Sequence, residues 1–379
     1  MTCAAAWSAR SLLSTICTMP AAVGLLEIVQ NAGNRSPPTL PPELLDRIIE
    51  FALELRRSVH STSLHSNIET LAPLTLVSIQ FRALALRHYF RHVFFAESGK
   101  ENSPWNALCR SGEKWFTWVR SLRASSKTLA FHSDQLAALT NLQELSLDLG
   151  TEGLFTQHPI LKQIFRYLLS GSSPINNINP SHTLTVLTLT SLPRIDIPLL
   201  RLITDSFPRL VDLHLSCTER LDLHCCWCCY EESFGITIHS PVPDMFSRSR
   251  DMAIAFAHIL RPLKQLAHLH LGVYLSDEML VHVHLDHGQA EGEFPFGPEQ
   301  CILCEEAAAE VQLRELAAGL ELAQYLKALR TIGFSSFFDD AAYYTRGRRL
   351  DETTVYVLRE NGRIRVRKTP WPRGETSNK

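Results

Sequence analysis

Apolar residues early in the chain predict a helix that begins near Leu40. In the segment LPPELLDRIIEFAL they recur at intervals of three and four residues, which is the spacing of one helical face. The positions are Leu40, Leu44, Leu45, Ile48, Ile49 and Ala52. Pro41 and Pro42 suit the first turn, where a missing N–H costs nothing, and Glu43 favours the positive end of the helix dipole.

A second helix is predicted in the run LAPLTLVSIQFRALALRHYF, after a polar loop. Its apolar residues are too many for one buried stripe on a solvated helix. They are Leu71, Leu74, Val77, Ile79, Phe81, Leu84 and Leu86. A short helix of this composition has to bury its sides against two partners.

Together the two segments resemble an F-box. The leading helix matches at Leu40, Pro41, Glu43, Leu44, Leu45, Ile48 and Ile49. The family's Leu-Ser-Leu-Val-Cys-Lys-x-Trp-Arg run corresponds to Leu74, Leu76, Val77, Ser78, Phe81 and Arg82. This chain departs from the family at Phe81, where Trp is usual, at the usual Lys position, which is Ile79 or Gln80, and in its longer loop before Thr70. The alternative interpretation is an ordinary helical hairpin with a proline start.

The F-box resemblance implies a function without bond chemistry. Members of the family dock on the Skp adaptor of an SCF-type cullin–RING ubiquitin ligase and hold a protein substrate near the ubiquitin-loaded enzyme. The resemblance therefore implies a non-catalytic adaptor subunit that acts in ubiquitination and protein degradation. The implied adaptor contacts are Leu40, Pro41, Leu44, Leu45, Ile48, Leu76, Val77 and Phe81.

From Leu139 onward the chain contains a repeated apolar pattern. In TNLQELSLDL, FPRLVDLHL, LKQLAHLHL and LKALRTIGF the apolar residues follow one another at steps of three, three and two, and HTLTVLTL is a shortened copy. The final step of two is strand alternation. The pattern is typical of a leucine-rich repeat, with one short parallel strand per unit and a returning helix or loop. Leu187 and Leu213, in successive units, are 26 residues apart, and the other spacings are longer. An unrelated α/β domain is the alternative.

The C-terminal region predicts a long helix followed by a hairpin. EEAAAEVQLRELAAGLELAQYL is rich in helix formers and should cover the last repeat. In TTVYVLRENGRIRVRK, two alternating runs flank Asn361-Gly362, which is a strong hairpin signal. The exposed face is expected to carry Arg359, Arg363, Arg365, Arg367 and Lys368. These basic residues could meet phosphate or simply solvate an edge strand.

Two C-x-x-C pairs indicate a candidate structural zinc site. Cys226 and Cys229 form one pair, and Cys301 and Cys304 form the other. Four thiolates could complete a tetrahedral Zn²⁺ site if the two segments fold back on each other. Cysteines that fill small core gaps, or a redox pair, are the alternative interpretations. A zinc-stabilised binding protein is therefore one rival to the ligase adaptor, and a leucine-rich-repeat scaffold that is not linked to ubiquitination is another.

Composition describes a globular chain with several domains. The 379 residues are 45% hydrophobic and 20% charged, with a net charge of −2, which gives no argument for nucleic acid. No apolar run reaches the roughly 18 residues of a membrane span, and we expect a cytoplasmic or nuclear protein. The fold class expected is α/β with an all-α N-terminal unit. The expected domains are a disordered leader (1–36), the F-box-like unit (37–95), the repeats (96–345) and the hairpin with its tail (346–379). Catalytic motifs such as G-x-x-x-x-G-K-[ST] are absent from the sequence.

Overall fold

This computed structural model describes eight segments of the chain, and the predicted leader and Leu40 lie outside them. The described residues are 41–57, 73–94, 113–131, 133–170, 183–217, 245–275, 302–335 and 352–371. The chain divides into two compact units. Unit 1 comprises Met1–Ala124 and Ala138–Leu142, and unit 2 comprises Ser125–Ala137 and Gln143–Lys379. The predicted domain boundaries stay predictions.

Unit 1 is mainly helical in its described residues 41–57 and 73–94. It contains α2 (Pro42–Arg57), a helical turn at 73–77, and α4 (Ile79–Arg91). The prediction of an all-α N-terminal unit needs one correction, because β1 (His92–Phe94) follows α4 directly. The β-branched and aromatic residues of this short run favour a strand. After the 3-10 helix η2 (Glu113–Trp118), β2 (Ser121–Ser125) pairs with β1 in parallel.

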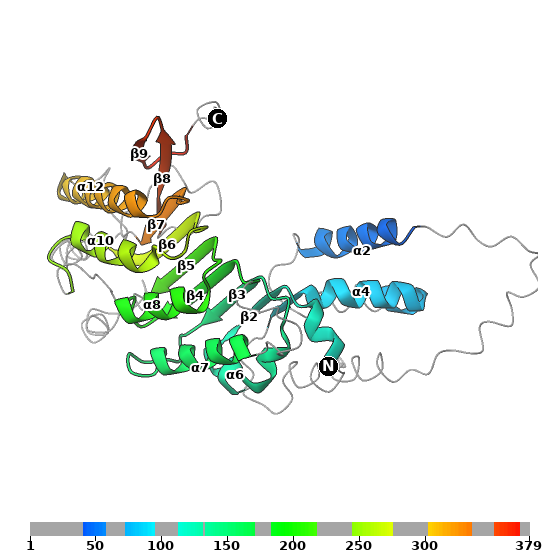
Figure 1. Ribbon diagram of the computed structural model, residues 1–379. Helices are drawn as coiled ribbons and strands as arrows, with labels where there is room; N and C mark the ends of the chain where they lie inside the picture. Colours follow the sequence, from blue (N-terminus) through cyan, green and yellow to red (C-terminus); the bar gives the residue numbers. More distant parts are fainter. Residues whose placement is uncertain are drawn as a thin grey trace, which may run out of the picture. The chain divides into compact units, whose positions relative to one another are not determined.

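Unit 2 is built on strands that follow one another in sequence order. β3 (Glu144–Asp148), β4 (Val186–Leu192), β5 (Asp212–Cys217), β6 (His268–Tyr274) and β7 (Thr331–Ser335) are parallel neighbours (Figure 1). The register aligns the buried leucines of the repeated pattern. One aligned row is Leu145, Leu187, Leu213, Leu269 and Ile332. A second is Leu147, Leu189, Leu215, Leu271 and Phe334. Both rows are buried, and they build the core side of the sheet.

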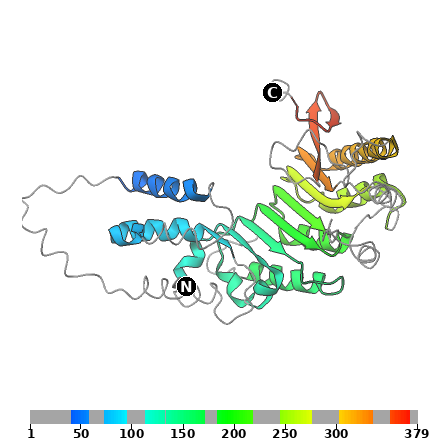
Figure 2. The ribbon, with the colours of Figure 1, turned by 180° about the vertical axis from the view of Figure 1, so that it is seen from behind.

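Helices return the chain between successive strands of unit 2, as parallel pairing requires. They are α7 (Gln157–Ser170), α8 (Ile197–Ser206), α10 (Ser249–Leu260) and α12 (Ile302–Tyr325), and the short helices α6 (Ser126–Phe131) and η3 (Ser133–Ala138) precede β3. α7, α8, α10 and α12 line one side of the sheet (Figures 1 and 2). Asp196 caps α8, because its carboxylate accepts a hydrogen bond from the N–H of Leu199 at 2.9 Å. None of the described helices is long and apolar enough to cross a membrane.

The predicted C-terminal hairpin is confirmed. β8 (Glu352–Glu360) pairs antiparallel with β7 and with β9 (Arg363–Arg367). At the turn Asn361 and Gly362 have φ of 50° and 74°, which is the left-handed region that an Asn-Gly turn supplies. The nine described strands, most of them parallel to their neighbours, and the helices together confirm a mixed α/β protein.

Two of the five basic hairpin residues, Arg359 and Lys368, point toward the helices and not toward the predicted exposed face. Arg359 donates hydrogen bonds to the carbonyls of Ala323, Leu326 and Leu329 at the end of α12. Lys368 pairs with the buried carboxylate of Glu315 on α12. The cause is strand alternation, which places every second side chain of the hairpin toward the helices. The hairpin therefore closes this end of unit 2 through specific polar contacts.

Candidate partner-binding surface

In unit 1, α2 and α4 pack against each other. Among the residues of α2 whose side chains are described (42–51), Leu45 and Ile49 are the buried apolar ones, and Ile49 is 0% exposed. The buried side chains of α4 are Ala85, Leu86, His88, Tyr89 and Phe90. This interface is the core that holds the outward side of α2 in place.

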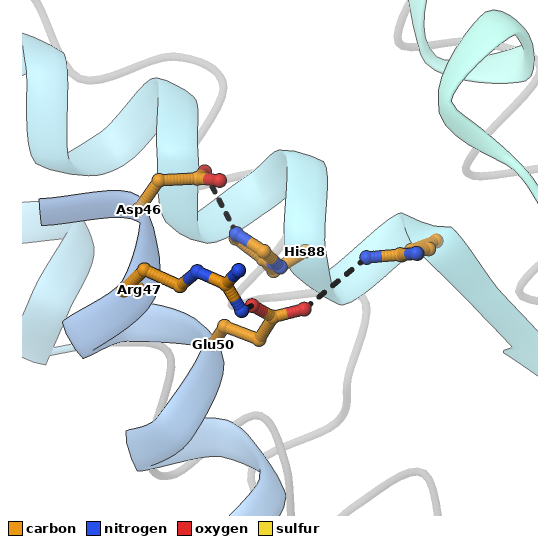
Figure 3. A network of polar contacts seen from close by, with 5 residues as sticks. Asp46, Arg47, Glu50 and His88 are labelled. Atoms are coloured by element: carbon orange, nitrogen blue, oxygen red, sulfur yellow. Dashed lines mark hydrogen bonds and ion pairs between the residues drawn. The ribbon is translucent and has the colours of Figure 1, made fainter. Parts of the chain in front are cut away.

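Polar contacts fix how α2 lies along α4 (Figure 3). The Nε2 atom of His88 lies 2.8 Å from Oδ1 of Asp46, and His88 is buried. Three to four residues further along both helices, Arg91 contacts Glu50 at 3.3 Å, and Arg47 contacts the same carboxylate at 3.4 Å. Both contacts advance in the same direction, so the two helices run parallel. The start of α2 therefore lies beside the middle of α4.

The outward side of α2 carries an apolar stripe, which we call the α2 stripe. It consists of Leu44, Ile48 and Phe51, whose exposed fractions are 51%, 52% and 63%. Intervals of four and three residues place these side chains one above another on a helix. Leu44 and Ile48 are exposed, although the residue that follows each of them is buried. Neighbouring residues on a helix of 3.6 residues per turn point about 100° apart, so they lie on different sides of the helix.

A second apolar group lies around the start of α4, and we call it the α4 lead-in. It consists of Leu76, Val77 and Ile79, which are 66%, 61% and 81% exposed. Ser78 sits between them as the N-cap of α4, because its hydroxyl accepts a hydrogen bond from the N–H of Phe81 at 3.1 Å. Arg82 donates from Nε to the carbonyl of Thr75 at 3.1 Å, which ties the preceding turn to the helix. These contacts fix the backbone that presents the three apolar side chains.

The two groups give this small helical unit six large apolar side chains that are each more than half exposed. Exposed apolar side chains that lie together mark interaction sites on soluble proteins. Burying such a surface gains roughly 25 cal/mol per Å² before the costs of association. The surface is therefore suited to binding an apolar partner surface.

Four of the eight predicted contact residues, Leu44, Ile48, Leu76 and Val77, lie on this surface, and Leu45 does not. Pro41, Leu44, Ile48, Leu76 and Val77 are exposed. Leu45 is buried, so it supports the α2 stripe from behind, and Phe81 is half-buried. The prediction placed all apolar residues of α2 on one face, whereas the helix pair divides them between two. Phe51 and Ile79 belong to the exposed surface and were missed, although the interval from Leu44 to Phe51 fits the helical period.

The predicted zinc ligands cannot be assembled from the described residues. Cys226, Cys229 and Cys301 lie outside them, and Cys304 falls in the first turn of α12, where its side chain is not described. Within the described segments no group of three or more His, Cys, Asp or Glu residues could hold a metal ion. Cys217, at the end of β5, is buried. The zinc site stays a prediction.

No family model, curated protein or solved structure matches this chain.

Proposed function

We propose that the chain is a substrate-recognition adaptor of an SCF-type cullin–RING ubiquitin ligase. Unit 1 docks on the Skp adaptor through the α2 stripe and the α4 lead-in, and unit 2 holds the protein substrate. The observation that carries the proposal is the exposure of Leu44, Ile48, Leu76 and Val77, at the positions where the sequence resembles an F-box. An isolated helical hairpin would not be expected to leave these side chains in water.

In this proposal the protein accelerates ubiquitin transfer by proximity. Tethering a substrate to the ligase makes the attack of a substrate lysine effectively intramolecular, and so raises its effective concentration. The chain then contributes binding and orientation. The bond chemistry belongs to the ligase and its ubiquitin-loaded enzyme.

The proposal is tested by measuring binding of the full chain to a purified Skp-family adaptor by calorimetry. Changing both Leu44 and Ile48 to Asp should weaken binding by at least about 100-fold, because two carboxylates would have to be buried in an apolar interface. The matched control changes Leu154 and Phe155 to Asp. These residues are also exposed, but they lie in unit 2 before α7, so adaptor binding should be unchanged.

The proposal fails if the unaltered chain does not bind the adaptor, or if the α2 stripe variant binds as tightly as the control variant. Circular dichroism of both variants checks that the helices are retained. Both sites of substitution are solvent-exposed, so neither pair of changes removes core packing.

A further inference from the structure

The sheet of unit 2 has a second face, opposite the buried leucine rows, on which most side chains are polar or small. We call it the polar face. It consists of the side chains that alternate with the buried leucines on β3–β7 and continue onto β8 and β9. Residues that the strand register pairs on neighbouring strands form rows that cross the sheet.

The first row of the polar face changes from acidic to basic. It contains Glu144, Val186, Asp212, His268, Thr331, Tyr356 and Arg367, in that order across seven strands. The middle of the row is polar and connected, because Nδ1 of His268 lies 2.7 Å from the hydroxyl of Thr331. Partial burial raises the pKa of Asp212, and the neighbouring His268 partly offsets this.

The second row consists of small residues and one pair of stacked histidine rings. It contains Ser146, Thr188, His214, His270, Gly333 and Thr354. The imidazoles of His214 and His270 are stacked, with centroids 4.2 Å apart and planes 9° apart. A Cβ atom at Gly333 would lie 2.2 Å from Nδ1 of His270, so the ring occupies the space that a side chain would need. The short hydroxyl side chains of Ser146, Thr188 and Thr354 stand beside these rings in the same row.

The acidic end of the polar face lies on β3–β5. Glu144 and Asp148 are exposed on β3, and Asp212 is half-exposed on β5. Among the described outward positions of β3–β7 there is no Lys or Arg. This end therefore favours a cationic group in the ligand.

The basic end lies on β9. Arg363, Arg365 and Arg367 alternate with the residues that face the helices. Trp371 orients two of them, with the guanidinium carbons of Arg365 and Arg367 at 4.9 and 4.0 Å from its ring centroid. Glu360 lies 3.6 Å from Arg365 and offsets one charge, so the end stays cationic and favours an anionic group.

The separation of the two ends sets the length of the ligand. Neighbouring strands lie about 4.8 Å apart, so the six steps from β3 to β9 span roughly 29 Å and the four steps from β5 to β9 roughly 19 Å. An extended chain rises about 3.3 Å per residue. We propose that the polar face binds an extended protein segment that crosses the strands, with basic and acidic residues about six to nine positions apart.

This inference goes beyond adaptor docking and can be tested without it. If both proposals hold, the segment is the part of the substrate that the ligase recognises. Binding of a peptide to the chain alone does not involve the Skp adaptor. A negative result in one of the two binding assays therefore does not decide the other proposal.

The test measures fluorescence anisotropy of labelled peptides with the full chain. One peptide has three lysines, about six Ser/Gly residues and three glutamates, its counterpart has the reverse order, and the control alternates the same charges. One of the two bipolar peptides should bind at least about fivefold more tightly than the control at about 50 mM salt, and lose this advantage at about 500 mM salt.

A charge-swapped variant identifies the surface. Glu144→Lys combined with Arg365→Glu should remove most of the preference for the tighter bipolar peptide, because it leaves the acidic end with one net negative charge and cancels the net positive charge of the basic end. If the swapped variant does not fold, Glu144→Gln and Arg363→Gln should each reduce the advantage. The proposal is overturned if neither bipolar peptide exceeds the alternating control, or if the changes on the polar face leave the preference as it was.

Discussion

Neighbouring isoleucines on α2 should separate stability from binding. Ile49 is fully buried between α2 and α4, whereas Ile48 is 52% exposed. Ile49→Ala removes three buried carbons at about 0.8 kcal/mol each and leaves a cavity, so we expect a loss of about 3–4 kcal/mol. Ile48→Ala removes the same atoms from a half-exposed site and gains helix propensity, so its cost should stay below about 1 kcal/mol.

Hydrogen exchange of the α2 and α4 amides measures this difference within unit 1, separately from unit 2. A loss of about 3 kcal/mol should raise the exchange rate of protected amides more than 100-fold, since about 1.4 kcal/mol corresponds to a factor of ten. Adaptor binding should respond in the opposite order. Ile48→Ala weakens it directly, because the side chain lies on the α2 stripe.

Equal losses of protection in the two variants would refute the assignment of helix faces. The exposed surface would then not be distinct from the core of the helix pair, and the proposed docking surface would lose its structural basis. A large effect of Ile48→Ala on protection would have the same meaning, because a half-exposed side chain contributes little packing.

Two further predictions concern a close contact in unit 2 and a buried phenol in unit 1. Gly333→Ala should displace the His270 ring and destabilise unit 2 by about 1–3 kcal/mol, seen in urea unfolding and in the histidine NMR signals. Gly153→Ala, where a Cβ meets nothing within 4 Å, should be nearly neutral, and equal effects would contradict the close contact at Gly333. Burial raises the pKa of Tyr89 from 10.0 to about 12, so stability present below pH 10 is lost as pH rises toward 12, by about 2–3 kcal/mol. Tyr89→Phe should remove this part of the alkaline loss, and an unchanged pH profile would count against the buried phenol.

The repeated leucine pattern was sufficient to predict the parallel strands of unit 2. The final two-residue step placed Leu145 and Leu147, and their equivalents, on one side of a strand, and those residues are buried in register. Asn361-Gly362 likewise determined the hairpin turn, because few other residue pairs accept positive φ at both positions. These features depend on short stretches of chain, so the sequence carries them directly.

Tertiary packing decided which side of each element faces a partner. Leu44 and Leu45 are chemically alike, and only the position of α4 leaves one exposed and buries the other. The sequence predicts Lys368 on an exposed face, but in the fold it pairs with the buried carboxylate of Glu315 on α12. The polar face also depends on the register of strands that are far apart in sequence. A single sequence determined the elements through local periodicity, whereas long-range contacts assigned the roles of their side chains.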